Sequence, residues 1–190
     1  GGNGTPANTA QVDYFTIATT GNAADFGDAS SATALLAASA SSTTRALFAG
    51  GYTPSAVDTI DYFTIASTGN YTDFGNLSSA RKAPGGLSSS TRSVFGGGGM
   101  PSAVNTIDYV TTATTGNASD FGDLFLARAI NDGTSNGTRG VWMGGTTSPA
   151  RRDTIDSIEI ATTGNAVNWG DFTVERQNGG ASSDSHGGLS

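Results

Sequence analysis

The chain has 190 residues, a formal net charge of −7 at pH 7 and a single lysine, Lys82. It therefore lacks a basic surface that would bind the phosphates of a nucleic acid or an anionic membrane, and we expect neither as a partner. It contains no cysteine, which excludes disulfides. Leu, Ile, Val and Phe account for only 33 residues. We therefore expect a thin core divided among repeated strands, in one domain over residues 1–190.

An internal repeat runs through the whole sequence. The triplet Thr-Gly-Asn occurs four times, at spacings of 48, 47 and 48 residues. The triplets begin at Thr20, Thr68, Thr115 and Thr163. Each triplet follows a β-rich run that contains an Asp and precedes an aromatic-glycine pair. Because the four copies fill the chain, we predict a repeat array.

The second copy shows the expected elements in chain order. Residues 59–66 are rich in β-branched and aromatic side chains on both faces, which is typical of a strand packed between two sheets. Gly69-Asn70 is suited to a hairpin turn and leads into a short strand at 73–76. A second turn is expected at 88–91, followed by a strand at 92–95. The helical period is absent, so we predict four short strands per copy.

The order of these features resembles the kelch repeat. Residues 81–97 run from an Arg to a glycine-closed strand, and an Asp-Tyr pair, an aromatic residue and the next Arg, Arg128, follow. The match departs from the kelch pattern in detail, because Phe replaces tryptophan in three copies and Thr33 stands where the other copies have Arg. The resemblance implies an all-β fold, a four-bladed β-propeller with blades of about 47 residues. Its repeat units would be 33–80, 81–127, 128–175, and 176–190 together with 1–32.

The two ends of the chain are expected to complete the last blade. Residues 186–190 align with Arg92–Gly96, and the glycines due next are Gly1 and Gly2. The C-terminal segment would then supply inner strands, and the N-terminal segment would supply outer strands. A monomeric ring of four blades and an eight-bladed ring shared by two chains both satisfy this pattern.

Two charged positions recur once in each copy. The repeated acids are Asp13, Asp61, Asp108 and Asp156, and the repeated bases are Arg45, Arg92 and Arg139, with His186 in the fourth place. A catalytic centre needs one asymmetric constellation, so recurrence favours a structural role for both positions. We expect each Asp to pair with the Arg of a neighbouring strand in a buried or half-buried ion pair.

The remaining motifs favour a scaffold over chemistry, and we predict no catalytic residue, metal or cofactor. The pairs Gly50-Gly51, Gly97-Gly98 and Gly144-Gly145 lack the Lys and the helix of a phosphate loop, which favours close backbone packing. The carboxylates at Asp25/Asp28 and Asp120/Asp123 suit calcium, but Asn breaks the pattern in the other copies and favours plain turns.

An enzyme is disfavoured by the residues that are missing. His186 is the only histidine, which excludes a histidine-dependent triad and a multi-histidine metal centre. Without cysteine, the copper site of galactose-oxidase-like kelch enzymes cannot be built. Carboxylates alone would still suffice for a glycosidase.

Candidate binding residues lie in the loops where the copies differ, and these loops are expected on one face of the disk. The candidates are Tyr52, Met100, Arg151 and Arg152. An aromatic ring, a soft apolar group and two cations suit a sugar or an acidic protein surface, while a plain solvated face is the competing interpretation. Trp142 and Trp169 occupy strand-like positions and are expected in the core.

The wording of the repeats, with Thr59-Ile-Asp-Tyr62 and Asp120-Phe-Gly-Asp123, is similar to kelch-like repeats in tail-fibre and other structural proteins of marine tailed phages. This resemblance implies a non-enzymatic structural or binding module of a virion or extracellular surface that mediates attachment or subunit contact. Its partners would be a protein or glycan surface, other virion subunits or a second copy of the chain. A glycan-binding propeller lectin is the alternative.

Overall fold

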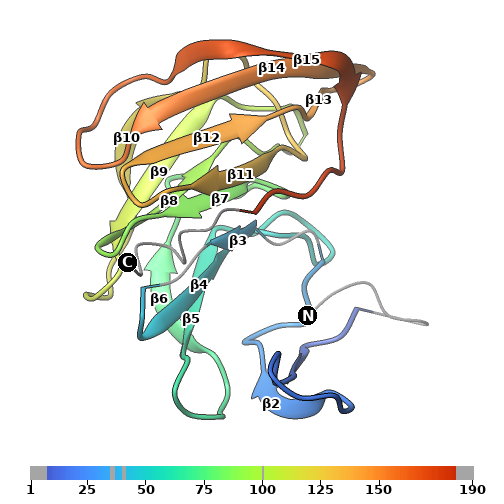
Figure 1. Cartoon of the computed structure of the whole chain (residues 1–190), viewed down its shortest axis with the longest axis vertical. Helices are drawn as coiled ribbons and strands as arrows, with labels where there is room; N and C mark the ends of the chain where they lie inside the picture. The colour runs from blue at the N-terminus through green and yellow to red at the C-terminus, as the bar shows by residue number, and fades with distance from the viewer. Residues whose placement is uncertain (1–7, 35–36, 40–41, 100, 183–190) are drawn as a thin grey trace.

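The computed structural model describes residues 8–34, 37–39, 42–99 and 101–182, and every regular element in them is a β-strand. All strand pairs are antiparallel, and the strands form a series of small sheets arranged one after another (Figure 1). No stretch of the described residues forms an apolar helix of membrane-spanning length. The expectation of an all-β fold is confirmed.

The first two sheets cover the N-terminal half of the chain. A hairpin of β1 (Gln11–Tyr14) and β2 (Ala24–Asp28) forms a two-stranded sheet. The next sheet has the order β3 (Ala37–Ser39), β4 (Arg45–Ala49), β5 (Thr59–Thr64), β6 (Thr72–Asn76). Its strands follow chain order because short turns connect each strand to its neighbour.

The third and fourth sheets repeat this meander. The third has the order β7 (Gly85–Ser88), β8 (Arg92–Gly96), β9 (Thr106–Thr111), β10 (Ser119–Asp123). The fourth contains β11 (Asp132–Ser135), β12 (Arg139–Met143), β14 (Ala150–Glu159) and β15 (Val167–Arg176), with β13 (Thr146–Thr147) paired to β14. The second and third sheets confirm the prediction of four short strands per copy, whereas the fourth has five strands, of which β14 and β15 are ten residues long.

The core lies between successive sheets and not inside any one of them. One cluster joins the second and third sheets, and includes Leu47, Ile60, Phe74 and Phe95. The other joins the third and fourth sheets, and includes Leu87, Val94, Phe121, Trp142 and Ile160. Each such side chain contributes roughly 1.5–3 kcal/mol when it is fully buried, so a few per sheet stabilise the stack despite the low apolar content.

The innermost strands of the sheets lie beside one another (Figure 1). Strand β7 contacts both β3 and β11. The Ser135 hydroxyl donates to the Ser88 carbonyl at 2.6 Å and accepts from the Ser88 N–H at 3.3 Å. A β-carbon at Gly133 would collide with the Gly86 carbonyl, so only glycine permits this approach.

The two ends of the sheet series lie apart. The β1–β2 hairpin is at one end of the molecule and β15 is at the other, so the described residues do not close into a ring (Figure 1). The segment expected to complete the last blade, residues 186–190 with Gly1 and Gly2, lies outside the described residues.

Candidate functional site

Three of the repeated aspartates are buried on the third strand of their sheets. The Asp108 carboxylate lies 2.9 Å from the Arg81 guanidinium, and Asp156 lies 3.0 Å from Arg128. All four side chains are at most 1% exposed. In two copies the repeated Asp therefore forms a buried ion pair, as expected, and its partner is the Arg that opens the same repeat unit.

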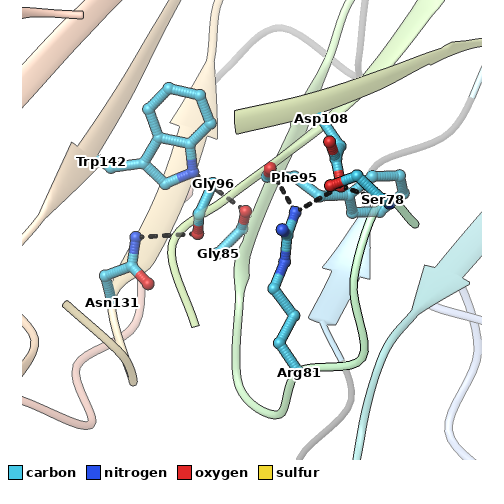
Figure 2. A network of polar contacts seen from close by, with 8 residues as sticks. All are labelled: Ser78, Arg81, Gly85, Phe95, Gly96, Asp108, Asn131 and Trp142. Carbon is cyan, nitrogen blue, oxygen red and sulfur yellow. Dashed lines mark hydrogen bonds and ion pairs between the residues drawn. The ribbon is translucent and has the colours of Figure 1, made fainter. Parts of the chain in front are cut away.

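A dense set of donors surrounds the Asp108 carboxylate, as Figure 2 shows. Its Oδ2 atom accepts from Arg81, from the Ser78 N–H at 3.0 Å and from the Ser78 hydroxyl at 2.9 Å. Arg81 also donates to the Phe95 carbonyl at 3.3 Å. Burial lowers the pKa of the Arg81 guanidinium, which Asp108 partly offsets. The backbone contact and the guanidinium recur around Asp156, which accepts from the Phe125 N–H and pairs with Arg128, but the hydroxyl does not, because Phe125 stands in the place of Ser78.

The ion pairs expected for Arg45, Arg92 and Arg139 with the repeated aspartates are wrong. Arg45 lies opposite Thr64, whereas Asp61 lies opposite Phe48, three residues further along the strand. That offset is about 10 Å, which is too far for a direct ion pair.

The three arginines make other contacts. Arg45 donates to the Ala113 carbonyl at 2.9 Å, and Arg92 donates to the Ile160 carbonyl at 2.9 Å, so each reaches the following sheet. Their guanidinium groups lie over the rings of Tyr62 and Tyr109. Arg139 forms an exposed ion pair of 3.0 Å with Glu159.

Asp61 and Asp13 differ from the other two aspartates. Thr33 replaces the Arg beside Asp61, whose carboxylate accepts from the Ser30 hydroxyl. Burial raises the pKa of Asp61, and the charge of Asp73 adds to the rise. Burial also raises the pKa of Asp156, where the Arg128 guanidinium opposes the rise. Asp13 is exposed on β1 and accepts from the Gln11 side chain at 3.2 Å.

The Gly-Asn turns fasten each sheet to the one before it. In the turn after β9, the Gly116 N–H donates to the Phe74 carbonyl at 2.7 Å and the Ala118 N–H donates to the Asn76 carbonyl at 2.8 Å. Between them, Asn117 Oδ1 accepts from the Asn76 N–H at 3.1 Å. We call this set of three hydrogen bonds the Gly-Asn latch.

The latch occurs three times in the described residues. The turn at Gly69–Tyr71 fastens to β2, that at Gly116–Ala118 to β6, and that at Gly164–Ala166 to β10. Sequence reasoning identified these residues as hairpin turns but missed the latch. The signal was the Asn itself, since Gly-Asn stands at the same place in every copy and offers a side-chain acceptor that a turn alone does not need.

The double glycines pack closely, as expected. The N–H groups of Gly51, Gly98 and Gly145 donate to the carbonyls of Arg81, Arg128 and Arg176, at 3.0, 2.8 and 2.9 Å. The preceding glycine in each pair has φ between 63° and 67°, and a β-carbon on Gly50 or Gly97 would meet the same arginine carbonyl. The pairs therefore hold the arginine backbone and form no phosphate loop.

A hollow of about 820 Å³ opens among the loops that follow the glycine pairs. Its charged lining comes from Lys82, Arg151 and Glu175, and its apolar lining includes Ile130 and Pro149. The hollow draws on the third and fourth sheets and on the segments that precede β7 and β11. It is therefore built by the divergent loops in which binding residues were predicted.

Only some of the predicted binding residues lie at this hollow. Arg151 lines it, and Tyr52 lies beside it, with the Lys82 ammonium 5.3 Å from the Tyr52 ring centre. Arg152 turns away and donates to the Thr147 hydroxyl at 3.4 Å. Met100 lies outside the described residues. Lys82 and Glu175 were missed because both lie outside the loops that follow the glycine pairs: Lys82 precedes β7 and Glu175 lies on β15.

The described residues hold no group of three or more His, Cys, Asp or Glu side chains arranged to bind a metal. The turns expected at Asp25/Asp28 and Asp120/Asp123 are wrong, because the first pair lies on β2 and the second on β10, both of which are paired strands. His186 lies in the part of the chain that the structure does not describe.

The two tryptophans have opposite environments. Trp142 is fully buried and donates from Nε1 to the Gly85 carbonyl at 3.0 Å, which confirms its expected place in the core (Figure 2). Trp169 is 58% exposed on β15, so the expectation of a core position is wrong for it. The equivalent Phe74 and Phe121 are buried because another sheet follows theirs, whereas none covers β15 among the described residues.

No family model matches the chain, and no curated protein matches it either.

Proposed function

We propose that the chain is a non-enzymatic structural and binding module, a propeller-type array of four kelch-like repeats that presents its loop face to a protein or glycan at a virion or extracellular surface. Meandering four-stranded sheets, cores between successive sheets and innermost strands that lie side by side all support the propeller arrangement. In this proposal β1 and β2 are the outer strands of the last blade, and its inner strands come from residues 186–190 with Gly1 and Gly2, which lie outside the described residues.

One observation carries the binding role. Most of the repeated charged residues form contacts within the array, whereas Lys82, Arg151 and Glu175 gather at a hollow to which the divergent loops contribute Arg151. Two cations beside an apolar wall suit a ligand that carries a carboxylate, such as an acidic protein loop that docks the module on a neighbouring subunit. Charged groups of this kind contribute to specificity and to the rate of association.

A glycan ligand is the second candidate, and the Tyr52 ring favours it. Tyr52 is half-buried beside Asn8 and Pro54 in a smaller hollow of about 270 Å³. An aromatic ring held at the edge of a hollow stacks on the apolar face of a sugar. Lys82 already lies over this ring, and would contact an acidic sugar from the other side.

Glycan-array screening of the whole chain, with Arg151→Ala and Tyr52→Ala beside it, tests the proposal. Arg139→Ala is the matched control, because Arg139 is also exposed but lies at the opposite end of its strand. Binding to acidic sugars that both variants lose and the control keeps would establish the lectin form. A co-purified or cross-linked protein whose contact depends on Arg151 alone would establish subunit docking. Binding that Arg139→Ala abolishes and Arg151→Ala leaves intact would refute the loop-face site.

A further inference from the structure

Successive sheets of this chain meet at a joint made of a Gly-Asn latch and, in two cases, a buried Asp-Arg pair. The two ends of the sheet series each carry one half of such a joint, without its partner half in the described residues. We propose that a second copy of this chain binds head to tail, so that the β1–β2 end of one copy fastens to the β15 edge of the next. This inference stands on the internal joints and does not depend on what the loop face binds.

The first half of the joint is the uncovered outer edge of β15. At the equivalent positions of β2, β6 and β10, the aromatic-glycine pair is covered by the Gly-Asn turn of the following repeat. A β-carbon on Gly75 would collide with the Gly116 carbonyl, whereas one on Gly170 would meet nothing within 4 Å. The groups on β15 that correspond to the bonded groups of β6 and β10 are the carbonyls of Trp169 and Asp171 and the Asp171 N–H. No Gly-Asn latch covers them in the described residues.

The second half is the Gly21-Asn22-Ala23 turn at the opposite end. It has the Gly-Asn pair of all three internal latches and the Ala of two of them, but it is exposed and no sheet precedes it in the described residues. By the pattern of the internal joints, the Gly21 N–H would donate to the Trp169 carbonyl and the Ala23 N–H to the Asp171 carbonyl. Asn22 Oδ1 would accept from the Asp171 N–H, as Asn165 Oδ1 does from the Asp123 N–H at 3.0 Å.

The two residues that correspond to the buried Asp-Arg pairs lie at opposite ends of the molecule. Arg176 aligns with Arg81 and Arg128, and its carbonyl is held by the Gly145 N–H at 2.9 Å as theirs are by the earlier glycines. Its guanidinium is nevertheless exposed and lies over the Phe172 ring, 4.4 Å from its centre. Asp13 aligns with Asp108 and Asp156, and is exposed on β1. The two opposite charges complete each other across the joint.

Exposed apolar side chains gather at these two ends. Phe15 and Ile17 are 70% and 92% exposed at the β1–β2 end, and Trp169 and Val174 are 58% and 64% exposed on β15. Ile160, which aligns with Ile17, is 1% exposed because the third sheet covers it. Apolar surface of this kind marks an interface, and burying Ile17 against a preceding sheet would give it the environment of Ile160.

The arrangement in space selects a second copy as the occupant. The β1–β2 hairpin and β15 lie at opposite ends of the molecule, so one chain in this arrangement cannot join its own halves (Figure 1). The joint uses a different surface on each partner, so copies add head to tail until the array closes on itself.

Charge-reversal variants test this proposal by complementation between chains. Asp13→Arg and Arg176→Asp should each raise the concentration for half-association by about tenfold or more, because each brings two like charges together at the joint. An equimolar mixture of the two variants restores an Asp-Arg pair at every joint, and should recover the wild-type association. Sedimentation velocity over a concentration series measures both effects. Asp120→Arg and Arg139→Asp are the controls, since both residues are exposed, and Asp120 lies on β10 while Arg139 lies opposite Glu159 at the far end of β14 from Arg152 and Arg176.

Trp169 supplies an independent readout. It passes from 58% exposed to buried when the joint forms, whereas Trp142 is already fully buried. Association should therefore shift the tryptophan emission to shorter wavelength, and a Trp169→Phe variant should lose that shift while it still associates.

Three results would overturn the proposal. A wild-type chain that keeps the mass of one copy at every concentration would show that no second copy binds. Variants that lose stability singly and are not rescued by mixing would show that the ends meet within one chain. Association that survives both charge reversals would place the interface elsewhere.

Discussion

Single residues in this protein show how a buried charge depends on its partner. Asp108 and Asp156 are almost fully buried and each has a guanidinium within about 3 Å, whereas the Asp61 carboxylate has the Ser30 hydroxyl. Burial raises the pKa of both Asp156 and Asp61, but only at Asp156 does a guanidinium, that of Arg128, oppose the rise. Removing one partner of a buried ion pair leaves an uncompensated charge and costs about 3–5 kcal/mol. A buried acid without a cation carries its desolvation cost in the native protein already.

We therefore expect opposite results from the same substitution at two equivalent sites. Asp156→Asn should lower the free energy of unfolding by roughly 3 kcal/mol, because Arg128 stays buried without its counter-ion. Asp61→Asn should leave it unchanged or raise it by about 1 kcal/mol at neutral pH, because it removes a charge and keeps an acceptor for Ser30. Urea unfolding of both variants at pH 7 checks this.

The pH dependence of Asp61 gives the control. Its folded-state pKa is raised, so native Asp61 binds its proton more tightly than unfolded Asp61 does. Its contribution to stability is present below the ordinary pKa of 3.8 and is lost as the pH rises through the folded-state pKa. The advantage of Asp61→Asn over the wild type should therefore shrink in acid. An equal advantage at acidic and neutral pH would contradict this account.

At the scale of elements, the Gly-Asn turn has two tasks. It takes part in the reversal of the chain between the third and fourth strands of its own sheet, and it fastens that sheet to the outer strand of the sheet before it. The aromatic-glycine pair makes the second task possible, because Gly75 and Gly122 have φ of 147° and 143° and leave room for a neighbouring carbonyl. The edge strand of each internal sheet is thereby covered.

Asn117→Ala should lower the free energy of unfolding by about 1 kcal/mol, since the N–H of Asn76 loses its acceptor. Asn22→Ala is the matched substitution in a turn that has no preceding sheet among the described residues. In dilute solution, where the chains are separate, it should change stability by less than half as much. Thermal or urea unfolding of the two variants side by side makes the comparison, and equal losses would argue against the latch.

The sequence predicts the elements better than it predicts their contacts. The strand predicted at 59–66 follows from local propensity, which the structure obeys, although the strand ends at Thr64. The chain reverses before β6 as predicted, but the turn lies at residues 64–67 and Gly69-Asn70 follows it, with Gly69 at a φ of 159°. The ion-pair partner of Asp108 could not be predicted from local propensity. Strand register places Arg92 opposite Thr111, three residues from Asp108, and Arg81, which precedes β7, forms the ion pair instead. Trp169 shows the same limit, since its burial depends on a neighbouring sheet and not on its own strand.

The whole molecule is a series of sheets in which each contacts mainly its neighbours. The third sheet is packed on both faces, by the cluster around Phe95 and by the cluster around Trp142. The β1–β2 hairpin has two strands, and most of its residues are exposed. In such an array, local stability is the sum of a sheet's own contacts and those with its neighbours.

Hydrogen exchange should therefore show a gradient along the chain. Amides of β8 and β9 should exchange slowest, those of β14 and β15 at intermediate rates, and those of β1 and β2 fastest. Mass spectrometry of exchanged peptides resolves these segments. Uniform protection across all four sheets would show instead that the array opens only as a single cooperative unit.

The replacement of Arg by Thr33 has a mechanical consequence. Sheets joined end to end carry a pulling force in series, so every joint bears the full load and the weakest one yields first. The joints next to Arg81 and Arg128 hold both a latch and a buried ion pair, whereas the one next to Thr33 holds a latch and, in place of the ion pair, the hydrogen bond from Ser30 to Asp61. Under tension the β1–β2 hairpin would detach from Gly69–Tyr71 before the other sheets separate, which would lengthen the molecule at one end and leave the loop-face hollow intact.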